Sequence, residues 1–396
     1  MGINKKNNKI ILIITIILDL SILVYFKYSA FIVNNINSIL HSNYTWSNVI
    51  LPLGISFYTF QAMSYPIDVY RERVSIQKNI LLFGTYISLF PQLIAGPIVR
   101  YSEIENQLGQ YHYSSAQMAG GIQRFVIGLS KKVLIANNIG MIWQYYSSSL
   151  SNGISLVGSW LGMIAFTLQI YFDFSGYSDM AIGLGKMLGF EFPENFRFPY
   201  MSKTITEFWR RWHITLGSWF RDYVYIPLGG NRKGLARQLL NILVVWALTG
   251  LWHGASWNFV IWGLYYALML VIEKLFVIKK QDKIPNIVLH VYTLLIVSFG
   301  WVIFQFTSLG ELCLYIKSLF DFKNLFSSAD IFMLSGNIIL IIVAVFFSTD
   351  SIYKIFNRIP DNVKAAIKPI AMILLLLMCT MYLVNDSYNP FLYFRF

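Results

Sequence analysis

The chain has 396 residues, of which 56% are hydrophobic and only 13% carry a charge. A soluble domain has about 25% charged residues, so this composition excludes an ordinary water-soluble globular protein and indicates a membrane protein. The net charge of +12 does not indicate nucleic-acid binding, because the basic residues, Lys131 and Lys132 among them, cluster between apolar stretches. Such clustering is typical of cytoplasmic loops under the positive-inside rule. We therefore expect contact with membrane lipids and no nucleic-acid partner.

Long uncharged stretches predict the membrane-spanning segments. In chain order they are residues 10–26 (interrupted only by Asp19), 42–67, 80–99, 154–172, 255–272, 288–306, 331–347 and 370–384. Because a spanning helix needs about 20 apolar residues, we expect an all-α, polytopic transmembrane protein with about 9–11 membrane segments, some of them re-entrant. Lysines before residue 10 predict a cytoplasmic N-terminus. Asp19 interrupts the first stretch and no small-residue cleavage site follows, so we expect an uncleaved anchor.

Residues 173–238 are more polar than the spans but remain rich in aromatic side chains. Such a mixture cannot face lipid, where unsatisfied polar groups are costly, but it can line a wet cavity or lie along the interface. Three prolines predict short helices and turns here: Pro193, Pro199 and Pro227. Glu207 is expected to pair with Arg210 or Arg211 one helical turn away. We expect one membrane domain over residues 1–396, in which 173–238 form the floor of a central funnel or tunnel.

Two histidines are the strongest candidates for chemistry. His253 lies in residues 251–258 (LWHGASWN), within the predicted spans of 239–306, and His213 lies in residues 208–216 (FWRRWHITL). An ionisable group in a spanning sequence must find a polar partner or a wet cavity, which makes it a functional candidate. Imidazole also titrates near neutral pH and can transfer protons there. The alternatives are a structural histidine bonded to a backbone carbonyl at 253 and an interfacial anchor at 213.

The sequence favours neither a metal site nor a disulfide. Its five histidines are far apart, and no His-x-x-x-His or Glu-x-x-His pair is present. Cys313 and Cys379 both lie in apolar surroundings, where packing is the simpler role. We expect no metal and no tightly bound cofactor.

Three stretches together resemble the core of the membrane-bound O-acyltransferase (MBOAT) family: residues 208–213 (FWRRWH), 221–230 (RDYVYIPLGG) and 251–255 (LWHGA). Three others are similar to its alginate O-acetyltransferase branch, bacterial enzymes that acetylate exported polysaccharides: residues 51–61 (LPLGISFYTFQ), 91–100 (PQLIAGPIVR) and 389–396 (NPFLYFRF). Members of this branch carry further spans before the match to residues 25–29 (YFKYS). The resemblance therefore implies that outer helices are missing or trimmed here.

The resemblance implies acyl transfer to a hydroxyl, with His253 as the general base. His213 matches a second active-site histidine, which would orient the donor or acceptor or stabilise negative charge. The expected co-substrate is acetyl-CoA, or another acyl-CoA or acyl-carrier thioester, that enters from the cytoplasm. The expected acceptor is a hydroxyl of an exported cell-envelope polysaccharide or of an extracytoplasmic relay partner protein. The implied location is the cytoplasmic membrane of a bacterium.

Further residues are candidates for binding the donor or the acceptor. Five basic residues could meet the phosphates of CoA, or could simply follow the positive-inside rule: Arg210, Arg211, Arg221, Arg232 and Lys233. Other candidates share the histidine motifs: Trp212, Trp252 and Asn258. Asp173 could hold a histidine tautomer or form a core hydrogen bond.

Other functions fit some of these features. D-alanyl transferases that modify teichoic acids share the two-histidine plan. A transporter or flippase for a lipid-linked glycan would also need many spans and a polar cavity, but it predicts sites repeated in two halves of the chain, and no such repeat is visible. A scaffold that only recruits a partner would make both histidines dispensable.

Overall fold

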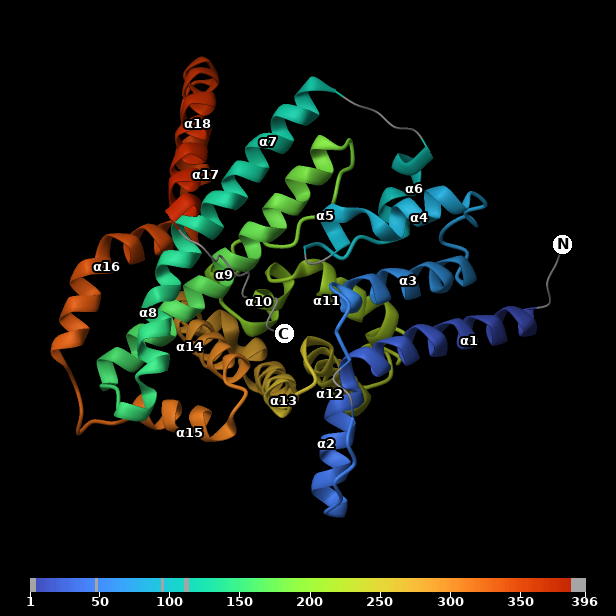
Figure 1. The fold of residues 1–396 in the computed structure, drawn as a ribbon, viewed down its shortest axis with the longest axis horizontal. Coiled ribbons are helices and arrows are strands. Elements are labelled where there is room, and N and C mark those ends of the chain that lie inside the picture. The colour runs from blue at the N-terminus through green and yellow to red at the C-terminus, as the bar shows by residue number, and fades with distance from the viewer. Residues whose placement is uncertain (1–4, 47–48, 94–95, 110–113, 386–396) are drawn as a thin grey trace.

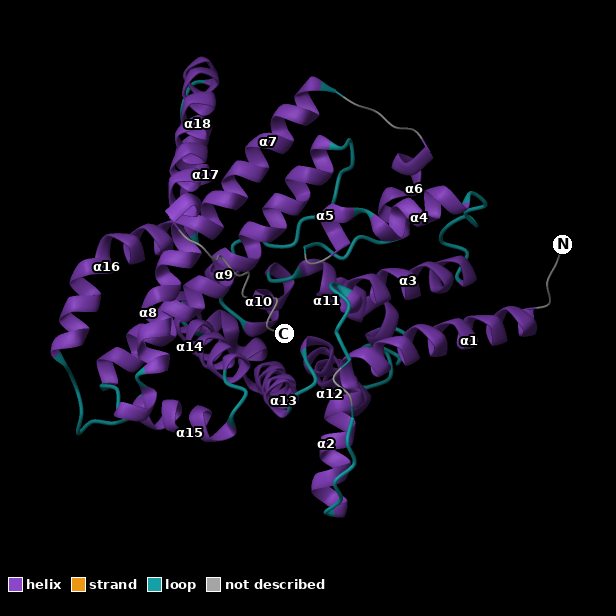
Figure 2. Ribbon diagram, viewed as in Figure 1, coloured by secondary structure: helices purple, strands orange, loops and turns teal. Residues whose placement is uncertain are grey.

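The computed structural model describes residues 5–46, 49–93, 96–109 and 114–385 (Figure 1). Throughout these residues all regular structure is helical, which confirms the all-α class (Figure 2). Eight helical stretches within them are long and apolar enough to cross a membrane: Asn8–Leu40, Ser115–Ser148, Leu156–Met187, Leu235–His253, Trp257–Lys283, Asn286–Gln305, Ser328–Phe347 and Asp361–Val384. The chain is therefore a polytopic membrane protein. The C-terminal stretch 389–396, part of the resemblance, lies outside the described residues.

Two stretches predicted to span the membrane form shorter helices. In residues 42–67 the helix begins only after Gly54, whose left-handed backbone (φ 78°) precedes α3 (Ile55–Tyr70). Residues 80–99 divide into α4 (Ile80–Ser88) and α5 (Phe90–Leu93). Pro91 explains the division, because proline lacks an N–H and its ring clashes with the carbonyl four residues earlier. The long spans of the described chain thus number eight, fewer than the about 9–11 segments expected from length alone.

The centre of the molecule is α9 (Leu156–Met187), most of whose residues are buried. It packs along α7 (Ser115–Ser130), η2 (Lys131–Ala136) and α8 (Asn137–Ser148), which follow one another without a break (Figure 1). Gly128 and Gly176 face each other at this contact, where a Cβ on either would meet the other's carbonyl oxygen. Small residues let membrane helices approach this closely.

Lys131 and Lys132 lie inside this continuous helical stretch, and not in a connection between spans as their place between apolar stretches predicts. Lys131 Nζ lies 2.6 Å from Asp179 Oδ2, and Lys132 forms an ion pair with Asp173. Both aspartates belong to α9. The sequence alone does not reveal these aspartate partners, because they belong to a neighbouring helix. Their negative charges allow the two lysines to lie within a membrane-spanning helix.

The central polar region starts later than its composition indicates, because α9 continues unbroken to Met187. Beyond it the chain forms short elements, as the prolines predict: η4 (Pro199–Met201), α10 (Ile205–Arg211), α11 (Ile214–Phe220) and η5 (Arg221–Tyr225). They lie amid α3, α9 and the helices that follow (Figure 1): α12 (Leu235–His253), α13 (Trp257–Ile272), η6 (Glu273–Val277), η7 (Ile278–Lys283) and α14 (Asn286–Gln305). Both candidate histidines are buried in this arrangement.

The remaining helices surround this core. They are α1 (Lys5–Leu23), η1 (Val24–Tyr28), α2 (Ser29–Leu40), α6 (Tyr101–Gly109), η3 (Leu150–Asn152), α15 (Leu309–Ser318), α16 (Ser328–Phe347), α17 (Ser351–Asn357) and α18 (Asp361–Asn385). In Figure 1, α2 and α18 project from the body. Their apolar side chains, and those of α1 and α16, are mostly exposed, as lipid-facing helices require.

Candidate active site

His213 lies at the junction of two short helices. α10 is capped by Thr204, whose hydroxyl accepts a hydrogen bond from Glu207 N at 3.0 Å, and it ends before Trp212. His213 then adopts a left-handed backbone (φ 43°), and α11 begins at the next residue. This conformation is uncommon for a residue other than glycine and is found preferentially at functional sites.

Asn195 holds this junction in place from a fully buried position. Its Oδ1 accepts hydrogen bonds from Thr215 N (3.3 Å) and Thr215 Oγ1 (2.9 Å), and it lies 3.1 Å from His213 Nδ1. The backbone carbonyl of Asn195 accepts a further bond from Ile214 N at 3.0 Å. Because a backbone N–H can only donate, the side-chain atom that faces Thr215 N is the amide oxygen. The proton of His213 must therefore reside on Nδ1, which leaves a lone pair on Nε2.

The free nitrogen of His213 is buried, and Nε2 has no hydrogen-bond partner among the described residues. Burial lowers the pKa of His213 from 6.5 to about 3, since desolvation disfavours the charged imidazolium. The ring is therefore neutral at physiological pH, and Nε2 can accept a hydrogen bond from a substrate O–H or N–H.

His253 is the last residue of α12, and its ring lies among aromatic side chains. The centroid of the imidazole is 5.1 Å from that of Trp252, 4.9 Å from Trp262 and 5.2 Å from Phe304. The ring of His213 lies 6.0 Å from the same Trp252. The fold thus brings the two histidines predicted from the sequence together around one buried indole.

Three further candidates belong to this neighbourhood. Trp252 lies between the two histidines as described. Asn258 is buried on α13 and donates from Nδ2 to the carbonyl of Phe304 at 3.0 Å, which steadies a residue that packs on His253. Trp212 is also buried, with its ring 4.6 Å from Trp301.

The other candidates have partners of their own or lie at the surface. Arg211 pairs with Glu207 at 2.7 Å, which confirms the predicted helical pair, and Arg221 pairs with Asp222 at 2.8 Å. Four of the five basic candidates are exposed: Arg210, Arg221, Arg232 and Lys233. Asp173 pairs with Lys132, and the neighbour of Asp173, Phe174, packs edge-on against His213 at 4.8 Å. The group that fixes the His213 tautomer is Asn195, which sequence reasoning did not single out.

Lys27 is the second residue that sequence reasoning missed. Its Nζ donates to the carbonyls of Trp252 (2.6 Å) and His253 (3.2 Å), at the end of α12. Lys27 is a charge within the spanning stretch Asn8–Leu40, so the rule that singled out His253 also applied to it. Asn195 offered no comparable signal.

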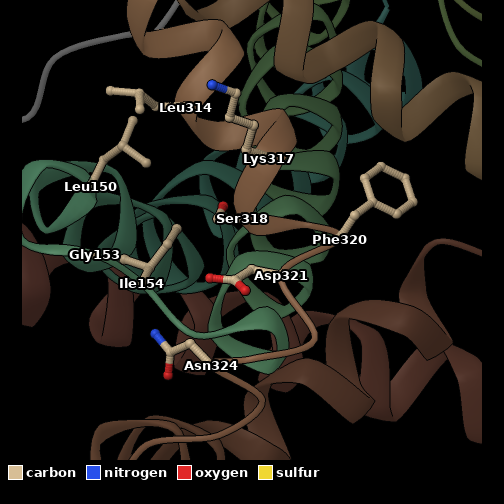
Figure 3. A pocket seen from close by; sticks show the side chains of 9 residues that line it. All are labelled: Leu150, Gly153, Ile154, Leu314, Lys317, Ser318, Phe320, Asp321 and Asn324. Carbon is tan, nitrogen blue, oxygen red and sulfur yellow. The ribbon is translucent and has the colours of Figure 1, made fainter.

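A separate cavity of about 390 Å³ lies between the connection from α8 to α9 and the end of α15 (Figure 3). It is lined by Leu150, Gly153, Ile154, Leu314, Lys317, Ser318, Phe320, Asp321 and Asn324. None of the candidate residues lines it, so it has no part in the site around Trp252.

Comparison with known proteins identifies the family of this chain. Residues 13–316, which include both histidines, match the profile "MBOAT, membrane-bound O-acyltransferase family". A Pseudomonas putida protein named "Probable alginate O-acetylase AlgI" is 38% identical over 419 residues, covering 100% of this chain and 86% of that relative. A Pseudomonas aeruginosa protein of the same name is 42% identical over 315 residues, covering 78% of this chain and 60% of the relative.

A Helicobacter pylori protein named "Peptidoglycan O-acetyltransferase" is 36% identical over 338 residues, covering 78% of this chain and 64% of that relative. This chain therefore spans less than two thirds of the length of the Pseudomonas aeruginosa and Helicobacter pylori relatives. The family match covers most of this chain and includes α12, which carries His253, and the junction at which His213 lies. The chain belongs to the membrane-bound O-acyltransferase family.

Proposed function

We propose that this chain is an O-acyltransferase of a bacterial cytoplasmic membrane. It moves an acetyl group from cytoplasmic acetyl-CoA to a hydroxyl of an exported cell-envelope polysaccharide, or of a relay partner protein. Family membership and the names of the relatives support O-acetylation. The observation that carries the proposal is the pair of buried imidazoles that both contact Trp252, one of them with a fixed tautomer.

In the proposed reaction His253 is the general base. It takes the proton of the acceptor hydroxyl while the hydroxyl oxygen attacks the carbonyl carbon of the thioester. The new C–O bond forms, the C–S bond breaks, and the proton passes from His253 to the departing CoA thiolate. The products are an acetyl ester and free CoA.

The tautomer of His213 restricts its part in this reaction. Its inner nitrogen, Nδ1, carries the proton and is occupied by Asn195. The other nitrogen, Nε2, presents a lone pair, so it cannot donate a hydrogen bond to a developing oxyanion. We infer that Nε2 accepts a hydrogen bond from a second hydroxyl of the acceptor or from an amide N–H of the pantetheine arm, and that His213 orients that substrate.

The distribution of charge supports a direction of transfer. α12 follows Arg232 and Lys233 and ends at His253, whereas α13 starts just beyond His253 and continues through η6 to the lysines of η7. The positive-inside rule puts these basic ends in the cytoplasm. His253 then lies toward the opposite face, where an exported acceptor would arrive. Transfer at this point would export the acetyl group and retain CoA.

The test uses the protein in membranes with radiolabelled acetyl-CoA. Label in an alkali-labile ester on polysaccharide or on a partner protein supports the proposal. In a parallel assay with a radiolabelled D-alanyl carrier, ester labelling from that donor and none from acetyl-CoA would replace the proposal with teichoic acid modification. Glycan translocation without ester formation would replace the proposal with a transport function. Normal ester formation after substitution of both histidines would show that the chain is only a scaffold that recruits a partner.

A further inference from the structure

Lys27 is a membrane-embedded ionisable residue that contacts the end of the helix carrying His253. It lies in η1, within the spanning stretch Asn8–Leu40. An ammonium group has three N–H donors, and Lys27 Nζ has three acceptors: Trp252 O at 2.6 Å, Ser56 Oγ at 2.9 Å and His253 O at 3.2 Å. All three are uncharged oxygens, and two of them are carbonyls at the end of a helix.

The end of α12 needs such a donor. The last carbonyls of a helix have no partner within the helix, and together they carry a partial negative charge. A left-handed glycine often supplies the missing hydrogen bonds, but Gly254 is extended here (φ −169°, ψ 158°). Lys27 bonds two of these carbonyls, and the hydroxyl of the adjacent Tyr28 donates to a third, that of Leu251, at 2.5 Å.

These contacts tie three distant segments together at the candidate base. Ser56 on α3 accepts from Lys27 through its hydroxyl and from Trp252 Nε1 through its carbonyl at 3.2 Å. The Lys27 ammonium also lies 5.9 Å from the centre of the Trp252 ring. The segment that supplies Lys27 and Tyr28 is a π-helical turn, a feature often found at functional sites.

We propose that Lys27 is a positioning residue for His253: by binding the carbonyls of Trp252 and His253, it fixes the final turn of α12 and with it the imidazole. This inference rests on the proposed function for its effect on acyl transfer. Its geometric part stands separately, because the contacts are with the backbone of the residue that carries the ring. Misplacement of a catalytic group by about 1 Å can cost about 100-fold in rate.

The test compares Lys27→Met with Lys27→Arg in the full chain. Lys27→Met removes the donors and the charge, so kcat should fall by about 10- to 100-fold while KM for acetyl-CoA stays within about twofold. Lys27→Arg keeps both and should recover a large part of kcat. The matched control is Lys274→Met, which removes a lysine from η6, the π-helical turn of another span. This control should retain wild-type kcat.

A second readout does not depend on catalysis. Deuterium exchange at the C2–H of each imidazole, followed by mass spectrometry, reports on the surroundings of individual histidines. Lys27→Met should change the exchange half-time of His253, because the ring moves relative to its neighbours, and should leave that of His213 unchanged. An unchanged His253 half-time in Lys27→Met, or equal loss of kcat in the methionine and arginine variants, would overturn the proposal. A changed half-time in a protein without acetyl transfer would support the positioning role and refute only the proposed function.

Discussion

The contacts described for the two histidines involve different parts of each residue. His213 is held through its ring, because Nδ1 meets the amide oxygen of Asn195 and thereby fixes the tautomer. His253 is held through its backbone carbonyl, which Lys27 binds, while aromatic rings surround the imidazole. A fixed tautomer suits a nitrogen that accepts a substrate hydrogen bond. A fixed backbone position suits a base whose distance to the reacting hydroxyl matters most.

This difference predicts that His213 is most sensitive to substitutions at its ring partner. Asn195→Leu leaves the donors of His213 and Thr215 without an acceptor, and each unsatisfied buried donor costs about 1–3 kcal/mol. We expect a lower thermal unfolding temperature and, because the His213 ring loses its orientation, about 100-fold slower transfer. Tryptophan fluorescence melts and acetyl-transfer rates in detergent measure both. Asn337→Leu on α16 is the control, since among the described residues that amide bonds a carbonyl of its own helix, that of Met333.

A smaller effect is expected one step farther from the ring. Thr215 Oγ1 donates to Asn195 Oδ1 at 2.9 Å and accepts from Ile98 N at 3.0 Å. Thr215→Val removes both bonds but leaves the contact between Asn195 and His213. We expect at most about a tenfold loss of kcat, with a destabilisation of about 1–3 kcal/mol from the unpaired Ile98 N–H. A loss of kcat as large as that of Asn195→Leu would show that Thr215, and not the amide contact, controls the ring.

The smallest predicted effect is a dependence of stability on pH. The pKa of His213 falls from 6.5 to about 3 on folding. Between these two pH values the imidazole is protonated in the unfolded chain and neutral in the folded chain. Above pH 6.5 the residue has no effect, and below it stability falls as pH falls, by about 1.4 kcal/mol per pH unit until the folded ring titrates near pH 3. Unfolding measured at pH 7.5 and 5.5 should show this loss in the wild type and less of it in His213→Gln. Equal losses in the two proteins would mean that the ring is not held neutral.

Much of the fold and part of the site could be predicted from the sequence. Long apolar stretches predict helical spans because the bilayer requires internal backbone hydrogen bonds. The same reasoning singled out His253, and prolines predicted the short elements around His213. Pairs one helical turn apart, such as Glu207 and Arg211, are local and equally predictable.

Contacts between distant segments could not be predicted in this way. Asn195 is an ordinary amide until the chain folds back and places it opposite His213 and Thr215. The positions of Lys131 and Lys132 between apolar stretches predict loop residues, and the sequence does not reveal their partners on another helix. The partner of a buried charge depends on how the helices pack. The hydropathy of the sequence does not show which helices pack together.

The central claim is that His253 acts as the base in acyl transfer. The direct measurement is acetyl transfer and acetyl-CoA binding by purified His253→Ala beside the wild type. We predict donor binding within about twofold of wild type and a loss of transfer of about 100-fold or more, as expected for removal of a general base. Transfer at the wild-type rate in His253→Ala would contradict the account.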